Sequence, residues 1–294
     1  MNTERKINKK DIIVSILCLV FVLMIVGSVG EGGRRSAKEK LCMANLSQWG
    51  RIFTAFSNDN NGYLFQGWFG DPQPGSSNAD KKMWMCVTWK YYQDPNLLFC
   101  PDAIQPADLG NSSAGKSNRA WGGITGLTWC QMPLPGVKDK NGNQAYWSPK
   151  GSYSENSWVA NKTGGNYTNY TNDPQYWRTM HIQNGNTVPM LGDSAWVDAW
   201  VMQSAAPPAY KDGDGLSGDN MWRVCVDRHT GKTNWVFMDT SVRPVLLKEL
   251  FTLRWSRQYV PENNPYTWAY YNGQGNPIAL WPDWMKDFAE YTGN

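Results

Sequence analysis

The chain has 294 residues, which is enough for one large domain or two small ones. Its 28 basic and 25 acidic residues nearly balance at a formal net charge of +3, and this balance argues against a nucleic-acid partner. All 17 tryptophans lie at or beyond position 49. The first 48 residues and the rest of the chain are therefore suited to different environments.

The first predicted element is a transmembrane helix over residues 11–29, preceded by a cytoplasmic basic leader, residues 1–10. Residues 12–29 (IIVSILCLVFVLMIVGSV) carry no charge and follow four basic side chains, Arg5, Lys6, Lys9 and Lys10. As a helix this run measures roughly 27 Å, close to the thickness of a bilayer core. A cleavable secretory signal is the alternative, with Ser28-Val29-Gly30 as a weak cleavage site.

Basic residues flank the apolar run equally on both sides, so charge does not decide its orientation in the membrane. The cysteines indicate the orientation instead. Five of the six cysteines lie beyond that run, and this usage suits an oxidising compartment: Cys42, Cys86, Cys100, Cys130 and Cys225. None of them forms the CxxC pairs of a zinc ribbon. We therefore predict a single-pass inner-membrane protein whose C-terminal head lies in the periplasm or at the cell surface.

A Gly hinge and an amphipathic helix are predicted over residues 30–57. Four glycines around Glu31 weaken a continuous helix, at roughly 1 kcal/mol each relative to Ala. Beyond them, apolar residues recur in steps of four and three on one helix face: Cys42, Leu46, Trp49, Phe53 and Phe56. Asn60-Asn61-Gly62 then predicts a turn. The remainder, residues 58–294, is predicted to be a globular, Trp-rich α+β head.

The stretch RHTGKTNWVFMDTSVRPV contains His229 and Asp239, which are spaced as if for catalysis. The pattern from Met221 to Val245 predicts a three-stranded antiparallel meander with two tight turns. In that arrangement His229 and Asp239 lie at opposite ends of a strand roughly 20 Å long, too far apart for proton transfer. We interpret both as structural: Asp239 caps turn amides, and His229 bonds backbone or an aromatic neighbour.

Other patterns predict no catalytic residue, no metal ligand and no cofactor. Residues 212–219 resemble an incomplete calcium loop, and we interpret them as a solvated acidic turn, with a bound ion as the alternative. The tryptophans are interpreted as core residues, Trp84, Trp89 and Trp235 among them. Exposed tryptophans that bind a glycan are the alternative.

Several segments, in a fixed order, resemble a known family. They are the apolar run followed by RRSAKEKLCMANLSQWG, then SNDNNGYL, LLFCPDA, KGSYSENSW and RHTGKTNWVFMDTSVRPVLLKELFTLRW. This order is similar to that of bacterial pilin-like proteins with a prepilin-type N-terminal helix and a C-terminal H-X9-DG signature. The resemblance covers most of the chain. It implies an α+β, pseudopilin-like fold, in which a long N-terminal helix (membrane half plus amphipathic half) packs on an antiparallel β-sheet head.

Two positions depart from the family pattern. Thr240 replaces the Gly that follows the Asp, so we expect a different turn type, because β-branched residues take positive φ poorly. The junction Lys9-Lys10-Asp11-Ile12 lacks both the Gly and the Glu of a prepilin cleavage site. We therefore expect an uncleaved chain.

The resemblance implies a membrane-anchored structural subunit of a type II secretion or type IV pilus-like apparatus, and not an enzyme. Its implied partners are the inner membrane and other pilin-like subunits. A surface-anchored glycan-binding protein is the first alternative, and a secreted hydrolase is the second. The resemblance also implies that Cys42 and Cys100 lie close together, as a disulfide or as two reduced thiols. Cys86–Cys100 is the competing disulfide.

Overall fold

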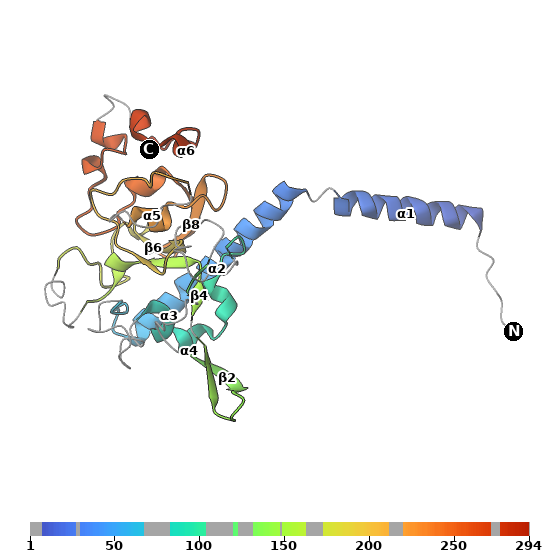
Figure 1. Ribbon diagram of the computed structural model, residues 1–294, viewed down its shortest axis with the longest axis horizontal. Coiled ribbons are helices and arrows are strands. Elements are labelled where there is room, and N and C mark those ends of the chain that lie inside the picture. The colour runs from blue at the N-terminus through green and yellow to red at the C-terminus, as the bar shows by residue number, and fades with distance from the viewer. Residues whose placement is uncertain are drawn as a thin grey trace.

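Two helices in succession lead into the head of the protein in a computed structural model that describes residues 8–27, 30–67, 83–103, 120–122, 132–147, 149–162, 173–211, 220–271 and 277–293. Helix α1 spans Lys9–Gly27 and lies outside the head, whereas α2 spans Glu31–Asp59 and runs into it (Figure 1). The predicted stripe on α2 is confirmed, because all five of its apolar side chains are buried. The helix also ends as predicted, with Asn60 as its C-cap.

The predicted membrane helix is wrong. No helix within the described residues is long and apolar enough to cross a bilayer. The predicted span extends to Val29, but α1 ends at Gly27 and begins with Lys9, Lys10 and Asp11. The uncharged part of α1 is therefore only about 24 Å long, less than the roughly 30 Å of a bilayer core. The predicted location, as a single-pass protein of the inner membrane, is therefore wrong as well.

The predicted fold class is also wrong. Its long helix with a membrane half is replaced by two separate helices, with the extended residue Gly30 as the N-cap of α2. The main sheet is mixed rather than antiparallel, because β5 (Tyr153–Asn156) pairs in parallel with β7 (Asp198–Ala199). The order of its five strands is β7-β5-β6-β8-β9, where β6 is Pro189–Asp193, β8 is Lys232–Phe237 and β9 is Val242–Leu246.

Smaller elements surround this sheet. Two two-stranded sheets pair β1 (Trp121–Gly122) with β4 (Lys150–Gly151) and β2 (Met132–Lys138) with β3 (Gln144–Trp147). Among the described residues, the short α-helices are α3 (Trp84–Val87), α4 (Trp89–Tyr92), α5 (Met221–Val224) and α6 (Asp283–Lys286), and several 3-10 turns accompany them. The head is thus an α+β unit in which many short elements pack around one long helix and one sheet.

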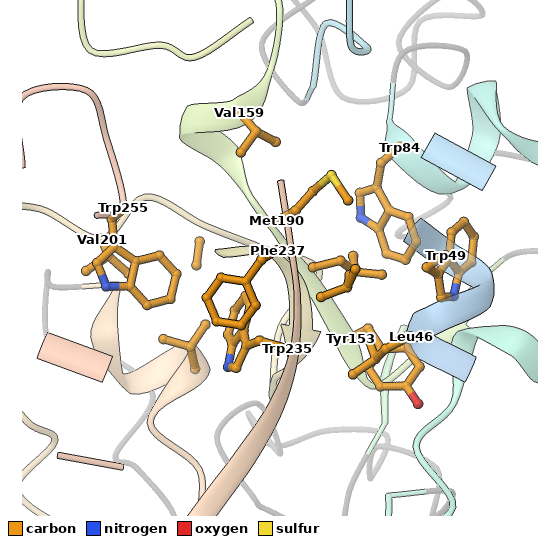
Figure 2. Close-up of a cluster of buried hydrophobic side chains, with 14 of the residues drawn as sticks. Leu46, Trp49, Trp84, Tyr153, Val159, Met190, Val201, Trp235, Phe237 and Trp255 are labelled. Carbon is orange, nitrogen blue, oxygen red and sulfur yellow. The ribbon is translucent and has the colours of Figure 1, made fainter. Parts of the chain in front are cut away.

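Strand β8 lies at the centre of the core. Val236 faces α2, where it lies next to Gly50, while Trp235 and Phe237 face the other side, as the two-residue period of a strand requires. Figure 2 shows both groups. Leu46 and Trp49 of α2 lie with Trp84 on one side, and Trp235, Phe237 and Trp255 pack together on the side away from α2. The core interpretation of Trp84, Trp89 and Trp235 is confirmed, and none of the tryptophans with described side chains is exposed.

The predicted meander is confirmed only in its last two strands. Strands β8 and β9 form an antiparallel hairpin, but Met221–Val224 is the short helix α5 instead of a strand. The hairpin loop uses the left-handed conformation that a Gly adopts most easily, since Thr240 has φ 69°. The amide of Thr240 donates to the Phe237 carbonyl at 2.8 Å. Thr240 therefore adopts the positive φ that a β-branched residue takes poorly, and the expected difference in turn type from the family stays a prediction.

Candidate functional site

Four side chains from separate parts of the chain meet beneath α2. Cys42 comes from α2, Cys100 from the segment after Pro95–Leu98, Asp193 from the end of β6, and His229 from the loop before β8. One potential ligand atom of each residue lies within 4.8 Å of the others, and all four residues are buried. The fold thus places two thiols, a carboxylate and an imidazole in one sealed group, which we call the Cys–Asp–His cluster.

The contacts within the cluster are short. Cys42 Sγ lies 3.6 Å from Asp193 Oδ1, and Cys100 Sγ lies 3.4 Å from His229 Nε2. The same His229 Nε2 lies 3.1 Å from Asp193 Oδ2. The Tyr153 hydroxyl adds a 3.4 Å hydrogen bond to Cys42 Sγ. The four groups therefore contact one another directly.

Asp193 is held in place by donors on both of its oxygens. The Arg228 guanidinium lies 3.1 Å from Oδ1 and also donates to the carbonyls of Ser152 and Ser194, at 2.7 and 2.9 Å. The Asn234 amide on β8 donates to Oδ2 at 2.7 Å. A fully buried carboxylate needs such partners, because burial of an unpaired charge is costly.

His229 is oriented from its other ring nitrogen. Its Nδ1 lies 3.3 Å from Asp102 Oδ2, and Lys38 from α2 pairs with the other oxygen of Asp102 at 2.9 Å. This contact fixes the ring so that Nε2 points at Cys100 and Asp193. These contacts form a chain that leads from Lys38 at the surface, through Asp102, to His229 in the cluster.

The electrostatics of the cluster follow from burial and pairing. Burial lowers the pKa of His229, but the charge and hydrogen bond of Asp193 outweigh that effect and raise it to about 10. For Asp193, burial acts in the opposite direction and raises the pKa of the carboxyl. The charges and hydrogen bonds of His229 and Arg228 outweigh burial, so the pKa of Asp193 falls below its usual value. Burial raises the pKa of the Cys100 thiol well above its usual value. Without a cation, the cluster is an imidazolium–carboxylate pair beside the protonated Cys100 thiol.

The structure does not bring His229 and Asp239 together. They lie at opposite ends of β8, as predicted, and exposed Asp239 accepts hydrogen bonds from the amide and hydroxyl of Ser241, at 3.0 and 2.6 Å. The capping role of Asp239 is confirmed. The partner expected for His229 is wrong, because its side chain contacts carboxylates and a thiol rather than backbone or an aromatic ring.

The expected proximity of Cys42 and Cys100 is confirmed, but both are free thiols rather than a disulfide. Cys86 is disulfide-bonded, so the competing Cys86–Cys100 pair is wrong. Asp193 and Asp102 were not predicted from the sequence, and His229 was not grouped with the cysteines. The signals in the sequence were Cys42 on a buried helix stripe and the implied proximity of Cys42 and Cys100.

A second buried polar group lies between β5 and β7. Asp198 pairs with Arg223 at 2.7 Å, and Glu155 and Lys162 lie within electrostatic reach of it. Burial raises the pKa of Asp198 to about 6, even though Arg223 and Lys162 oppose the shift. Burial and the charge of Asp198 raise the pKa of Glu155 as well. This group is a titratable element of the core, in which both carboxylates are buried and Arg223 is partly exposed.

A surface groove of about 570 Å³ runs along α2, lined by residues that include Asn45, Asp94 and Phe99. Among the described residues that line it, Asp94 is the one titratable side chain, so they provide no acid/base pair. The calcium-loop candidate at 212–219 lies outside the described residues.

In comparisons with known proteins, no family model, no curated protein and no solved structure matches this chain.

Proposed function

We propose that the protein is a non-enzymatic structural subunit of a pilin-like assembly, of the type II secretion or type IV pilus kind, and that other pilin-like subunits are its partners. The observation that carries the proposal is the exposed apolar surface of α1. Eight large apolar side chains between positions 12 and 21 are 43–62 % exposed: Ile12, Ile13, Val14, Ile16, Leu17, Leu19, Val20 and Phe21.

These side chains cover most of the circumference of α1, with Ser15 and Cys18 on the remaining side, and they span almost three turns. A helix with so broad an apolar surface is normally buried in its working state, and an exposed apolar patch of this kind marks an interaction site. The apolar stripe of α2 is already covered by the head. Helix α1 is therefore the part left for partners, and matching helices of neighbouring subunits suit it.

The absence of enzymatic activity is part of the proposal. The Cys–Asp–His cluster is sealed, with the His229 side chain 1 % exposed and that of Asp193 fully buried. An imidazole and a carboxylate buried to this extent are not accessible to a substrate in this structure. The glycan-binding alternative gains no support either, since no tryptophan with a described side chain is exposed.

The oligomeric state of the full-length protein tests the proposal. We expect light scattering after size-exclusion chromatography, and negative-stain microscopy, to show assemblies larger than one chain. Leu17→Glu with Phe21→Glu places two charges on α1 and should yield monomers whose head melts as in the wild type. Tyr210→Glu, at an exposed head position, is the matched control and should assemble normally.

Two outcomes would contradict the proposal. One is a wild-type chain that stays monomeric at all concentrations tested. The other is a Leu17→Glu, Phe21→Glu protein that forms the same assemblies as the wild type, which would remove α1 as the contact surface.

A further inference from the structure

The Cys–Asp–His cluster has the composition of a closed metal site. Thiolate and imidazole groups are the ligands that zinc prefers, carboxylates also bind it, and structural zinc sites have four protein ligands. Cys42, Cys100, Asp193 and His229 supply one ligand atom each, and these atoms lie within 4.8 Å of one another. The cluster therefore has both the number and the kinds of ligand that zinc requires.

The distances between ligand atoms also fit a tetrahedral ion. Zinc–sulfur bonds of about 2.3 Å and zinc–nitrogen or zinc–oxygen bonds of about 2.0–2.1 Å place neighbouring ligand atoms roughly 3.3–3.8 Å apart. With Asp193 Oδ2 as the ligand oxygen, the observed distances are 3.7 Å to Cys42 Sγ and 3.1 Å to His229 Nε2, and Cys100 Sγ lies 3.4 Å from His229 Nε2. Only small side-chain shifts are needed to bind an ion at the centre.

The surrounding groups orient the ligands in the way that metal sites require. A zinc-bound histidine usually donates its other ring N–H to a carboxylate, which fixes the tautomer and the ring. Asp102 provides that carboxylate at His229 Nδ1, 3.3 Å away. The Tyr153 hydroxyl and the Asn234 amide provide hydrogen bonds to the Cys42 sulfur and to Asp193.

Charge balance supports a divalent ion. Two thiolates and the Asp193 carboxylate carry three negative charges, which a divalent cation and the adjacent Arg228 neutralise together. A neutral total matters here, because an uncompensated charge in a buried site is strongly unfavourable. Zinc also fits the sulfur ligands better than calcium or magnesium, which prefer oxygen.

We propose that Cys42, Cys100, Asp193 and His229 form a structural zinc site that fastens α2 to the sheet of the head. The ion is held by the helix, by the 100–102 segment, by the end of β6 and by the loop before β8. All four positions around the ion are filled by protein, so its role is to stabilise the fold and not to activate water. This site is independent of any assembly through α1.

Metal content of the full-length protein tests the proposal. Protein produced in zinc-supplemented medium and purified without chelator should contain about one zinc per chain, measured by inductively coupled plasma mass spectrometry. Replacement of zinc by cobalt(II) should give the intense visible bands of a tetrahedral ion and a near-ultraviolet thiolate-to-cobalt band. Cys100→Ser should lose that near-ultraviolet intensity and most of the bound zinc.

Cys225→Ser is the matched control. Cys225 is a third buried free thiol, where its sulfur contacts Met285 at 4.0 Å, and its loss should leave zinc content and the cobalt spectrum unchanged. Asp102→Asn is a second variant, for the case in which Cys100→Ser does not fold. Asp102 is partly exposed, so its replacement should leave the fold intact. It should weaken zinc binding about 10- to 100-fold, as measured by competition with a chromophoric chelator.

The contrary results are distinct. Wild-type protein that binds no zinc when loaded with the metal, or whose cobalt complex lacks the thiolate band, would overturn the proposal. So would a Cys42–Cys100 disulfide in non-reducing peptide maps of protein from native cells. Equal zinc loss in Cys225→Ser and Cys100→Ser would show that the metal binds without this geometry, which also rejects the site.

Discussion

Gly192→Ala is expected to be among the most destabilising single-methyl additions in the head. Gly192 on β6 lies opposite Trp235 on β8 in the sheet. A Cβ atom at Gly192 would lie 2.2 Å from one carbon of the Trp235 indole and 2.5 Å from two others. Carbon atoms in contact prefer separations of about 3.5–4.0 Å, so the ring or the strand must move by more than roughly 1 Å.

Trp235 has little room for such a movement. Its side chain is fully buried, it packs edge-on against Trp255 with ring centroids 5.2 Å apart, and its indole N–H donates to Thr233 Oγ1 at 2.9 Å. Overpacking of a core costs about 1–3 kcal/mol, and loss of the indole hydrogen bond adds about 1 kcal/mol. We expect Gly192→Ala to lower the free energy of unfolding by about 3 kcal/mol, and the melting temperature by roughly 6–12 °C.

Thermal unfolding followed by near-ultraviolet circular dichroism measures this effect, since the tryptophans dominate that signal. Gly32→Ala is the control, because nothing lies within 4 Å of the added atom, and it should melt as the wild type does or slightly higher. A double-mutant cycle with Trp235→Leu should recover most of the loss, because the clash disappears with the ring. A Gly192→Ala protein with wild-type melting would refute the proposed contact between the ring and the glycine.

Three further predictions concern single residues. Thr240→Gly should raise the free energy of unfolding by about 0.5–1 kcal/mol in urea titrations, because φ 69° strains a β-branched residue; a loss would contradict this. His229→Ala should cost about 3 kcal/mol or more, because it breaks a buried charged network, whereas exposed His181→Ala should stay within about 0.5 kcal/mol of the wild type; equal effects would contradict this. The folded pKa of Asp198, about 6, lies above its unfolded value, so the stability from this group is complete below about pH 4 and is lost as pH rises through 6. The stability of the wild type relative to Asp198→Asn should therefore fall by about 3 kcal/mol between pH 4 and pH 7, and a constant difference would contradict this.

The parts of the fold that the sequence predicted are those set by local periodicity. The apolar stripe of α2 and the β8–β9 hairpin both follow from spacings within a few residues. Met221–Val224 shows the limit of this reasoning. Its alternation suggests a strand, but Met221, Trp222 and Val224 are all buried, and tertiary packing makes the segment a helical turn.

The Cys–Asp–His cluster could not be predicted in this way, because its members are far apart in the chain. The contact between Cys42 and Asp193 joins residues 151 positions apart, and that between Cys100 and His229 joins residues 129 positions apart. Sequence motifs for zinc depend on pairs of ligands a few residues apart, which a single turn can hold. Here each ligand comes from a separate element, so the site exists only after α2 has packed on the sheet.

The spacing of His229 and Asp239 now has a physical explanation that involves no catalysis. Strand β8 has six residues, and the short turns that flank it account for the rest of the interval. At one end, His229 enters the Cys–Asp–His cluster and ties the strand to α2. At the other end, Asp239 and Thr240 form the turn that sets the register of β9. The interval is thus one interior strand with its flanking turns, and its two ends have different roles: one anchors the sheet to the long helix, and the other fixes the pairing of the next strand. A change in the number of residues between them would separate these two functions, because a one-residue shift turns every side chain of β8 to the opposite face.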